Sequence, residues 1–309
     1  MSVSQEEPVA EATHPGAGEA AASPTSSAPV KEGVRRSAWY KFRRDPVGIA
    51  ASLFLLLCVV VAIFAPWIAP DSPDIGSVLH RLEPIGSAGH ILGTDEQGRD
   101  LLTRVMYGLR VTLFIGVVSV LASGVIGITL GIIAGYFHRV VNMIVMRFLD
   151  VFYAFPATIL AIAISAALGP GFKNSLIALP FVFVPPIARV VETSVQQVKR
   201  RQYFEAAMAS GAGDLMIIRY HLIGNVLRPV LSYISSLFGI SIIVGTGLSF
   251  LGLGVQPPTA DLGSMLQSLQ SSIYLQPMVA LVPGLAIFLV VMAFNLLSDS
   301  LQDVFDSRI

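Results

Sequence analysis

Long apolar runs separated by short polar segments dominate this chain. An apolar helix needs about 20 residues to cross the hydrocarbon layer of a bilayer. Six stretches approach or exceed that length: Val47–Ala69, Val111–Tyr136, Phe148–Leu168, about Leu176–Val191, about Val230–Leu251 and Met278–Leu297. The fourth is short and interrupted by Pro185-Pro186, which a membrane helix tolerates where its neighbours satisfy the freed carbonyls. The pattern predicts an all-α, polytopic membrane protein with about six transmembrane helices.

The composition supports a membrane protein and sets the N-terminus apart. Of the 309 residues, 54% are hydrophobic and 13% are charged, whereas a soluble domain usually has about 25% charged residues. Residues 1–36 are rich in Ala, Glu, Pro, Ser and Thr and have little to bury, so we predict a disordered N-terminal tail there. Residues 37–309 form the predicted transmembrane domain. Its first apolar run is too long for the h-region of a signal peptide, which indicates a membrane anchor that stays.

The distribution of basic residues predicts how the spans are oriented, because cytoplasmic loops carry an excess of Lys and Arg. The N-terminal flank and the connections between spans two and three and between spans four and five are basic (Lys31, Arg35, Arg36, Lys41, Arg43, Arg44; Arg139, Arg147; Lys199, Arg200, Arg201, Arg219, Arg228). By contrast, residues 169–175 contain only Lys173, and residues 252–277 contain no Lys or Arg. Residues 71–110, with four arginines, are an exception. The count predicts that both termini face the cytoplasm.

The chain lacks the sequence motifs of the common catalytic and nucleotide-binding sites. The P-loop pattern G-x-x-x-x-G-K-[ST] does not occur, and neither does a paired-cysteine metal pattern. The histidines are scattered along the chain (His14, His80, His90, His138 and His221), so we predict no metal site. We therefore predict a passage-forming protein rather than an enzyme, and energy for transport must come from a partner or a gradient.

Ionisable residues within the predicted spans are scarce. Asp150 stands at the start of the third predicted span, and Arg189 and Glu192 stand near the inner end of the fourth, where charged groups can reach water. Proton-coupled pumps usually place acidic or histidine relays across the membrane, so this pattern disfavours such a pump. A secondary transporter or channel working alone, and a membrane scaffold that transports nothing, remain alternatives.

Two further patterns concern helix packing and a polar loop. Gly127, Gly131 and Gly135 recur every four residues, which places a glycine strip on one helix face and favours close helix packing. In the loop between spans four and five, about 192–229, Tyr203–Ser210 contains good helix formers, and Gly211 follows where a left-handed cap could end that helix. Asp214 is then predicted to cap a second short helix. Two short helices with a glycine elbow would make a stiff protrusion, although the loop could instead lie along the membrane surface.

The same loop carries a family resemblance. Glu205-Ala206-Ala207-x-x-x-Gly211, followed by His221-Leu222-Ile223, resembles the EAA loop of permease subunits of binding-protein-dependent ABC importers. In that family the loop forms coupling helices that dock in a groove of the cytoplasmic ATPase. The resemblance implies that Glu205, Ala206, Ala207, Gly211 and Asp214 belong to the ATPase-coupling loop. The chain has Gly224 where the family often has Pro.

Other segments resemble the C-type permeases of dipeptide, oligopeptide and nickel importers, over about residues 37–309. They are His90–Asp100, Arg147–Asp150 with Ala154–Pro156, Leu248–Pro258, and the tail Asp299-x-Leu301-x-Asp303-x-x-Asp306-x-Arg308. Leu262 stands where the family often has Trp. The resemblance implies the type I ABC importer permease fold, a lipid-embedded position in the bacterial inner membrane, and no nucleic-acid partner.

The resemblance also implies a set of partners. They are a sister B-type permease in a heterodimer, two cytoplasmic ATPase subunits that use ATP and Mg, and an extracytoplasmic substrate-binding protein. The outer segments Gly252–Pro277 and Asp95–Arg110 are a candidate surface for that binding protein. No cofactor is expected on this chain itself. The expected substrate is a dipeptide or short oligopeptide, with nickel and glutathione as alternatives, and the substrate-binding residues stay unidentified.

Overall fold

The computed structural model describes residues 42–211 and 213–306, and the predicted tail at residues 1–36 lies outside them. Within the described residues every named element is helical, and two isolated β-bridges occur in the segment between the first two long helices. Five helices are long and apolar enough to cross a membrane, and a bent helix pair would make a sixth. The prediction of an all-α protein with about six transmembrane helices is confirmed.

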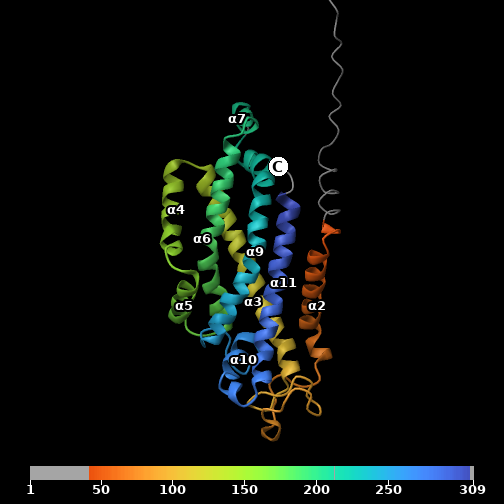
Figure 1. Ribbon diagram of the computed structural model, residues 1–309. Coiled ribbons are helices and arrows are strands. Elements are labelled where there is room, and N and C mark those ends of the chain that lie inside the picture. Colours follow the sequence, from red (N-terminus) through yellow and green to blue (C-terminus); the bar gives the residue numbers. More distant parts are fainter. Residues whose placement is uncertain (1–41, 212, 307–309) are drawn as a thin grey trace, which may run out of the picture.

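The long helices run roughly side by side, as Figure 1 shows. They are α2 (Pro46–Ile68), α3 (Leu101–Tyr136), α6 (Phe172–Lys199), α9 (Ile223–Phe250) and α11 (Pro277–Asp306). The short helix α7 (Gln202–Ala209) projects beyond one end of this bundle, and α10 (Leu262–Ser268) lies at the other. We call these the α7 end and the α10 end. The described chain begins and finishes at the α7 end (Figure 1), as an even number of crossings requires.

The third predicted span differs from the expectation. It consists of α4 (Arg139–Tyr153) and α5 (Ala157–Leu168), bent by 89°, so it begins nine residues before Phe148. The break falls at Pro156, which caps α5 and has no backbone N–H to continue the α4 hydrogen-bond ladder. The prediction that Asp150 starts this span is therefore wrong. Asp150 lies eleven residues into α4, about 16 Å along the helix axis at 1.5 Å per residue.

Asp150 is paired with a charge from the neighbouring helix. Its carboxylate accepts a hydrogen bond from the Arg189 guanidinium of α6, and the Arg189 guanidinium carbon lies 5.4 Å from the centre of the Tyr153 ring. The side chains are 47% exposed for Arg189 and 37% for Asp150. An ion pair thus lies on an open face of the bundle, in the last turn of α4 and ten residues before the end of α6.

The fourth span is longer and more regular than its proline content suggests. We expected a short, interrupted helix, but α6 continues for 28 residues through Pro180, Pro185 and Pro186. Packing against α3 accounts for this. A Cβ added to Gly127, Gly131 or Gly135 of α3 would lie 2.5–2.7 Å from Ile187, Val191 or Val195 of α6, respectively. This close approach lets α3 bury the face of α6 that follows Pro185 and Pro186 (Ile187, Val191 and Val195 are each 0% exposed).

The buried residues form two main clusters that meet along α3 and α9. One joins α3, α5, α6 and α9 and includes Ile187 and Val244, and the other joins α2, α3, α10 and α11 and includes Leu55 and Val290. The outward faces of α2 and α11 expose large apolar side chains instead (Leu53, Leu56, Leu57, Ile63, Leu281, Leu285, Phe288). Exposed apolar faces of this extent are typical of helices in contact with lipid or with another membrane subunit.

Candidate functional site

The polar loop at the α7 end forms a helix–glycine–helix hook. Helix α7 finishes at Ala209, and Gly211 follows with φ +76°, a left-handed conformation that glycine adopts at little cost. The chain then turns back through α8 (Asp214–Ile217) and one π-helical turn, Ile218–Leu222, directly into α9. The hook is therefore continuous with α9, one of the helices that are long and apolar enough to cross a membrane.

Asp214 lies in the hook but has a different role from the one predicted. The N-cap of α8 is Gly213, and Asp214 is the first residue of that helix. Its carboxylate accepts a hydrogen bond from the Tyr136 hydroxyl at 2.6 Å. The prediction that Asp214 caps a second helix is therefore wrong, because the carboxylate points to the end of α3 rather than to its own backbone.

A lysine completes a polar junction at this point. The Lys199 ammonium, at the end of α6, donates to the carbonyl oxygens of Tyr136 at 2.9 Å and Gly135 at 3.3 Å. These carbonyls belong to the last turn of α3, where a positive charge is favourable. The junction of Tyr136, Lys199 and Asp214 thus joins the ends of α3 and α6 to the hook.

Apolar anchors hold the base of the hook. Phe204 of α7 is 4% exposed, and Ile217 and Leu222 are fully buried; all three belong to the same core cluster as the centre of α6. Burying side chains of this size contributes about 1.5–3 kcal/mol each. The hook is therefore packed onto the bundle rather than hanging from it.

The opposite face of the hook is open. Glu205 and Ala206 are exposed and Ala207 is half-buried. Around them lie exposed large apolar side chains (Met208, Leu215, Met216 and Tyr220, between 52% and 80% exposed). A projecting patch that mixes apolar groups with a carboxylate is typical of a protein-binding surface.

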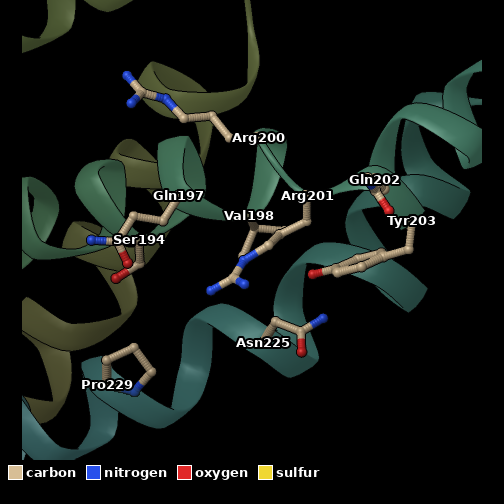
Figure 2. A pocket seen from close by; sticks show the side chains of 9 residues that line it. All are labelled: Ser194, Gln197, Val198, Arg200, Arg201, Gln202, Tyr203, Asn225 and Pro229. Carbon is tan, nitrogen blue, oxygen red and sulfur yellow. The ribbon is translucent and has the colours of Figure 1, made fainter. Parts of the chain in front are cut away.

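A pocket of about 710 Å³ lies at the base of α7, between the end of α6 and the start of α9. Figure 2 shows the Arg201 guanidinium and the Tyr203 hydroxyl both pointing into it, with Arg200 pointing away. Asn225 and Gln197 add further polar groups to its wall. This pocket was not predicted from the sequence. The feature of the sequence that could have indicated it is the basic run Lys199-Arg200-Arg201. Which of these side chains points into the pocket, however, depends on the turn that follows α6.

The α10 end brings together the two outer segments singled out from the sequence. Glu96 accepts hydrogen bonds from the hydroxyls of Ser271 and Ser272, the latter at 2.6 Å, and these bonds hold the pKa of Glu96 below its usual range. Asp261 caps α10 and accepts a hydrogen bond from Thr112 of α3 at 2.8 Å. Burial raises the pKa of Asp261, although these hydrogen bonds oppose the shift. Residues of the two segments therefore contact one another.

Two family models match the chain. Residues 127–309 match the binding-protein-dependent transport system inner membrane component, and residues 34–84 match the N-terminal TM domain of oligopeptide transport permease C. The chain belongs to the permease family of binding-protein-dependent ABC importers. The predicted resemblance to C-type permeases of the peptide and nickel importers is confirmed.

Relatives extend over most of this permease. It is 39% identical over 274 residues to the glutathione transport system permease protein GsiD of Pectobacterium atrosepticum, covering 89% of this chain and 91% of that protein. It is 40% identical over 271 residues to the proteins of the same name from Escherichia coli O6:K15:H31 and Shigella boydii serotype 4, covering 88% of this chain and 89% of each relative.

A solved structure supports the fold. The permease superposes on a chain of a crystal structure described as an amino acid ABC transporter with histidines, with a TM-score of 0.52 and 18% identity, covering 67% of this chain and 95% of that one. At this identity the likeness concerns the fold alone. Together with the family models it establishes a multi-pass permease with the type I ABC importer fold.

Proposed function

We propose that this permease forms half of the translocation pathway of an ATP-driven importer of short peptides, glutathione among them. A B-type sister permease supplies the other half, two ATPase subunits bind ATP and Mg at the cytoplasmic side, and an extracytoplasmic binding protein delivers substrate. One matched family model is named for oligopeptide transport, and the relatives reported above are named for glutathione transport. Because glutathione is itself a modified tripeptide, both names support a peptide-sized passage.

The hook is the proposed contact with an ATPase, and its projection from the α7 end is the observation that carries this proposal (Figure 1). Glu205, Met208 and Leu215 offer a carboxylate beside apolar groups, which suits insertion into a groove of a partner. ATP binding would move the hook, and the junction of Tyr136, Lys199 and Asp214 would pass the movement to α3 and α6. Since α3 and α6 pack through Gly127, Gly131 and Gly135, they would move as one unit.

In this proposal the α7 end faces the cytoplasm of a bacterium and the α10 end faces outward across its inner membrane. Three observations support this orientation. The hook and its flanks carry Lys199, Arg200, Arg201 and Arg219, the segment 252–277 carries no Lys or Arg, and both ends of the described chain lie at the α7 end. The surface formed by residues 95–110 and 252–277 would then receive the binding protein.

We propose that the ion pair between Asp150 and Arg189 lies beside the passage. A charged group deep in a membrane protein is costly in lipid and usually faces a partner helix or a water-filled cavity. Both side chains are well exposed on this chain, so the face of α4 and α6 that carries them would be turned toward the sister permease or the passage. A zwitterionic peptide could interact with either charge as it crosses.

Transport by reconstituted vesicles tests the proposed substrate and the coupling together. The permease is assembled with its partners in proteoliposomes, with ATP on the ATPase side and the loaded binding protein on the other. We expect ATP-dependent uptake of labelled glutathione or a dipeptide, and loss of uptake in a Glu205→Lys variant that still inserts. Uptake of nickel but of neither peptide would overturn the substrate proposal, and normal uptake by Glu205→Lys would overturn the contact at the hook.

A further inference from the structure

Two histidines that are ten residues apart in the sequence face one another at the α10 end. The rings of His80 and His90 lie 5.9 Å apart between centroids. Among the described residues, the ligand atoms of His80, Glu83 and His90 all lie within 4.8 Å of one another. We predicted no metal site because the histidines are scattered along the sequence. In the structure, however, two of them are neighbours.

The backbone beneath these three residues is held by a buried threonine. The Thr94 hydroxyl donates to the carbonyl oxygen of His80 and accepts from the backbone N–H of Glu83, the latter at 2.8 Å. Thr94 is 0% exposed, and its own N–H donates to the Glu83 carbonyl. The turn that follows is closed by a bond from the Gly86 N–H to the Ile91 carbonyl at 3.0 Å. These contacts keep the backbones of His80 and Glu83 together and bring the chain back to His90.

A carboxylate orients the second histidine. His90 Nδ1 lies 3.0 Å from Asp100 Oδ1, and Asp100 is 1% exposed. If the Nδ1–H group of the imidazole donates this hydrogen bond, the lone pair of Nε2 is free to bind a metal. The same arrangement occurs where a carboxylate supports a metal-binding histidine. The other Asp100 oxygen accepts from the Thr103 N–H at 2.7 Å and caps α3. Because both oxygens are already used, Asp100 serves as a support, and a second possible group of Asp71, His90 and Asp100 is less suited to hold an ion.

We propose that His80, Glu83 and His90 bind one divalent transition-metal ion of the Zn²⁺ type, and that Asp100 is a positioning residue for His90. Two imidazole nitrogens and one carboxylate oxygen suit Zn²⁺, Co²⁺, Ni²⁺ or Cu²⁺ better than Ca²⁺ or Mg²⁺, which favour oxygen ligands. In a tetrahedral Zn²⁺ site the ligand atoms lie about 3.3 Å apart, given metal–ligand distances of about 2.0 Å. The three ligand atoms lie at most 4.8 Å apart, so small side-chain movements would bring them to these distances.

The ligand types and their exposure suit this site. A glutamate carboxyl group is ionised at neutral pH, which is the form that a metal requires. The His80 side chain is 52% exposed and that of Glu83 is 26% exposed, which leaves a route for an ion to enter. The bound ion would fasten the turn at residues 78–94 to the start of α3 through His90 and Asp100. The site does not depend on the proposed peptide substrate.

Metal titration of the purified full chain tests the site. The chain carries an affinity tag without histidine and is titrated in detergent with Co²⁺, and then with Zn²⁺ in competition with a chromogenic chelator. We expect one tight site per chain, a visible Co²⁺ absorption band that Zn²⁺ removes and Ca²⁺ leaves unchanged, and a higher unfolding temperature with Zn²⁺.

Variants assign the binding to these residues. His80→Ala and Glu83→Gln should each weaken Zn²⁺ binding by at least about tenfold. Asp100→Asn should weaken it about 10–100-fold, while the asparagine still caps α3. His138→Ala is the matched control, because His138 lies at the other end of α3, and it should bind as the wild type does. The proposal is overturned if the wild type binds Zn²⁺ no more tightly than His80→Ala, or if all four variants bind alike.

Discussion

The two ends of the helix bundle are stabilised by different kinds of contact. At the α10 end, charged groups are buried and paired within the chain: Asp95 is 3%, Arg99 5% and Arg104 3% exposed, with Arg99 Nε 2.7 Å and Arg104 Nε 3.5 Å from Asp95 Oδ2. At the α7 end, the hook is held by a few apolar anchors and one polar junction. Its carboxylate Glu205 and its large apolar side chains are left exposed.

The difference concerns how each end keeps its shape. At the α10 end the buried Asp95 carboxylate faces two buried guanidinium groups, so contacts within the chain fix the backbone there, and exposed apolar side chains such as Val78, Leu79 and Tyr274 are still available to a partner. The hook presents groups whose burial requires another protein, while its base is firmly packed. A surface that is open on one side and anchored on the other can bind a moving partner and transmit its movement. The variants below test this contrast, from the largest expected effect to the smallest.

Asp95→Asn should cost the most stability. The substitution leaves Arg99 and Arg104 buried without their counter-charge, and breaking a buried ion pair costs about 3–5 kcal/mol. We expect a large fall in unfolding temperature and little protein in the membrane, measured by thermal unfolding in detergent and by immunoblot. Asp74→Asn is the comparison variant, because it removes an exposed carboxyl from the same segment that interacts with Arg104 less strongly than Asp95 does. Equal stability of the two variants would contradict the contrast.

Gly211→Val should spare the fold and remove transport. A β-branched residue at φ +76° costs about 1–2 kcal/mol, and no described atom lies within 4 Å of the position that its Cβ would take. The strain therefore acts on the hook rather than on the core. We expect normal insertion, ATPase binding weakened about tenfold, as 1.4 kcal/mol implies, and uptake lost or nearly so.

Two controls accompany that variant. Gly213→Val places the same side chain two residues away, where φ is −68°, and should transport normally. Gly211→Asn should transport better than Gly211→Val, because asparagine tolerates the left-handed conformation. Normal uptake by a correctly inserted Gly211→Val variant would show that the hook does not take part in transport.

Tyr136→Phe should have an intermediate effect on coupling. It deletes the hydrogen bond to Asp214, and a bond to a charged group is worth about 1.5–3 kcal/mol, or less where it is partly exposed. We expect the complex to assemble and to hydrolyse ATP while uptake per ATP falls several-fold. Tyr220→Phe is the control, since it removes a hydroxyl from a 68% exposed side chain of the hook and keeps the aromatic ring in the exposed patch. An unchanged ratio of uptake to hydrolysis would show that the junction does not transmit movement.

Glu96→Gln should have the smallest effect. Because the pKa of Glu96 is lowered in the folded chain, the carboxylate contributes stability above the usual glutamate pKa of about 4.3, and this contribution is lost as pH falls through the lowered value. Solvent screening keeps it below about 1 kcal/mol. Thermal unfolding at several pH values should show a small wild-type advantage near pH 7 that disappears below about pH 4. An advantage that grows at low pH would contradict the assignment.

Local patterns in the sequence were enough to predict the architecture. Apolar runs of about 20 residues identified the spans, and the position of Gly211 after a run of helix formers matched its left-handed conformation in the structure. The glycines at 127, 131 and 135 lie on one face of α3, as their spacing requires. Each of these features depends on neighbours within one or two helical turns, so a single sequence contains the information.

Features that depend on distant partners could not be predicted in this way. The partner of Asp214 is Tyr136, 78 residues away, so a capping role was the natural local interpretation. Helix α6 continues through three prolines because α3 packs along it, which its own residues do not reveal. The turn that brings His80 to His90 depends on the buried hydroxyl of Thr94, and the inward orientation of Arg201 depends on the geometry of the turn between α6 and α7.

The composition of the complex tests the central claim most directly. The complex is purified in mild detergent through a tag on this chain and weighed by intact mass spectrometry, with Gly211→Val measured alongside. The account predicts one copy of this permease, one different permease and two ATPase subunits, with the ATPases depleted in the variant. A wild-type preparation that contains this chain alone, or only copies of itself, would contradict the account.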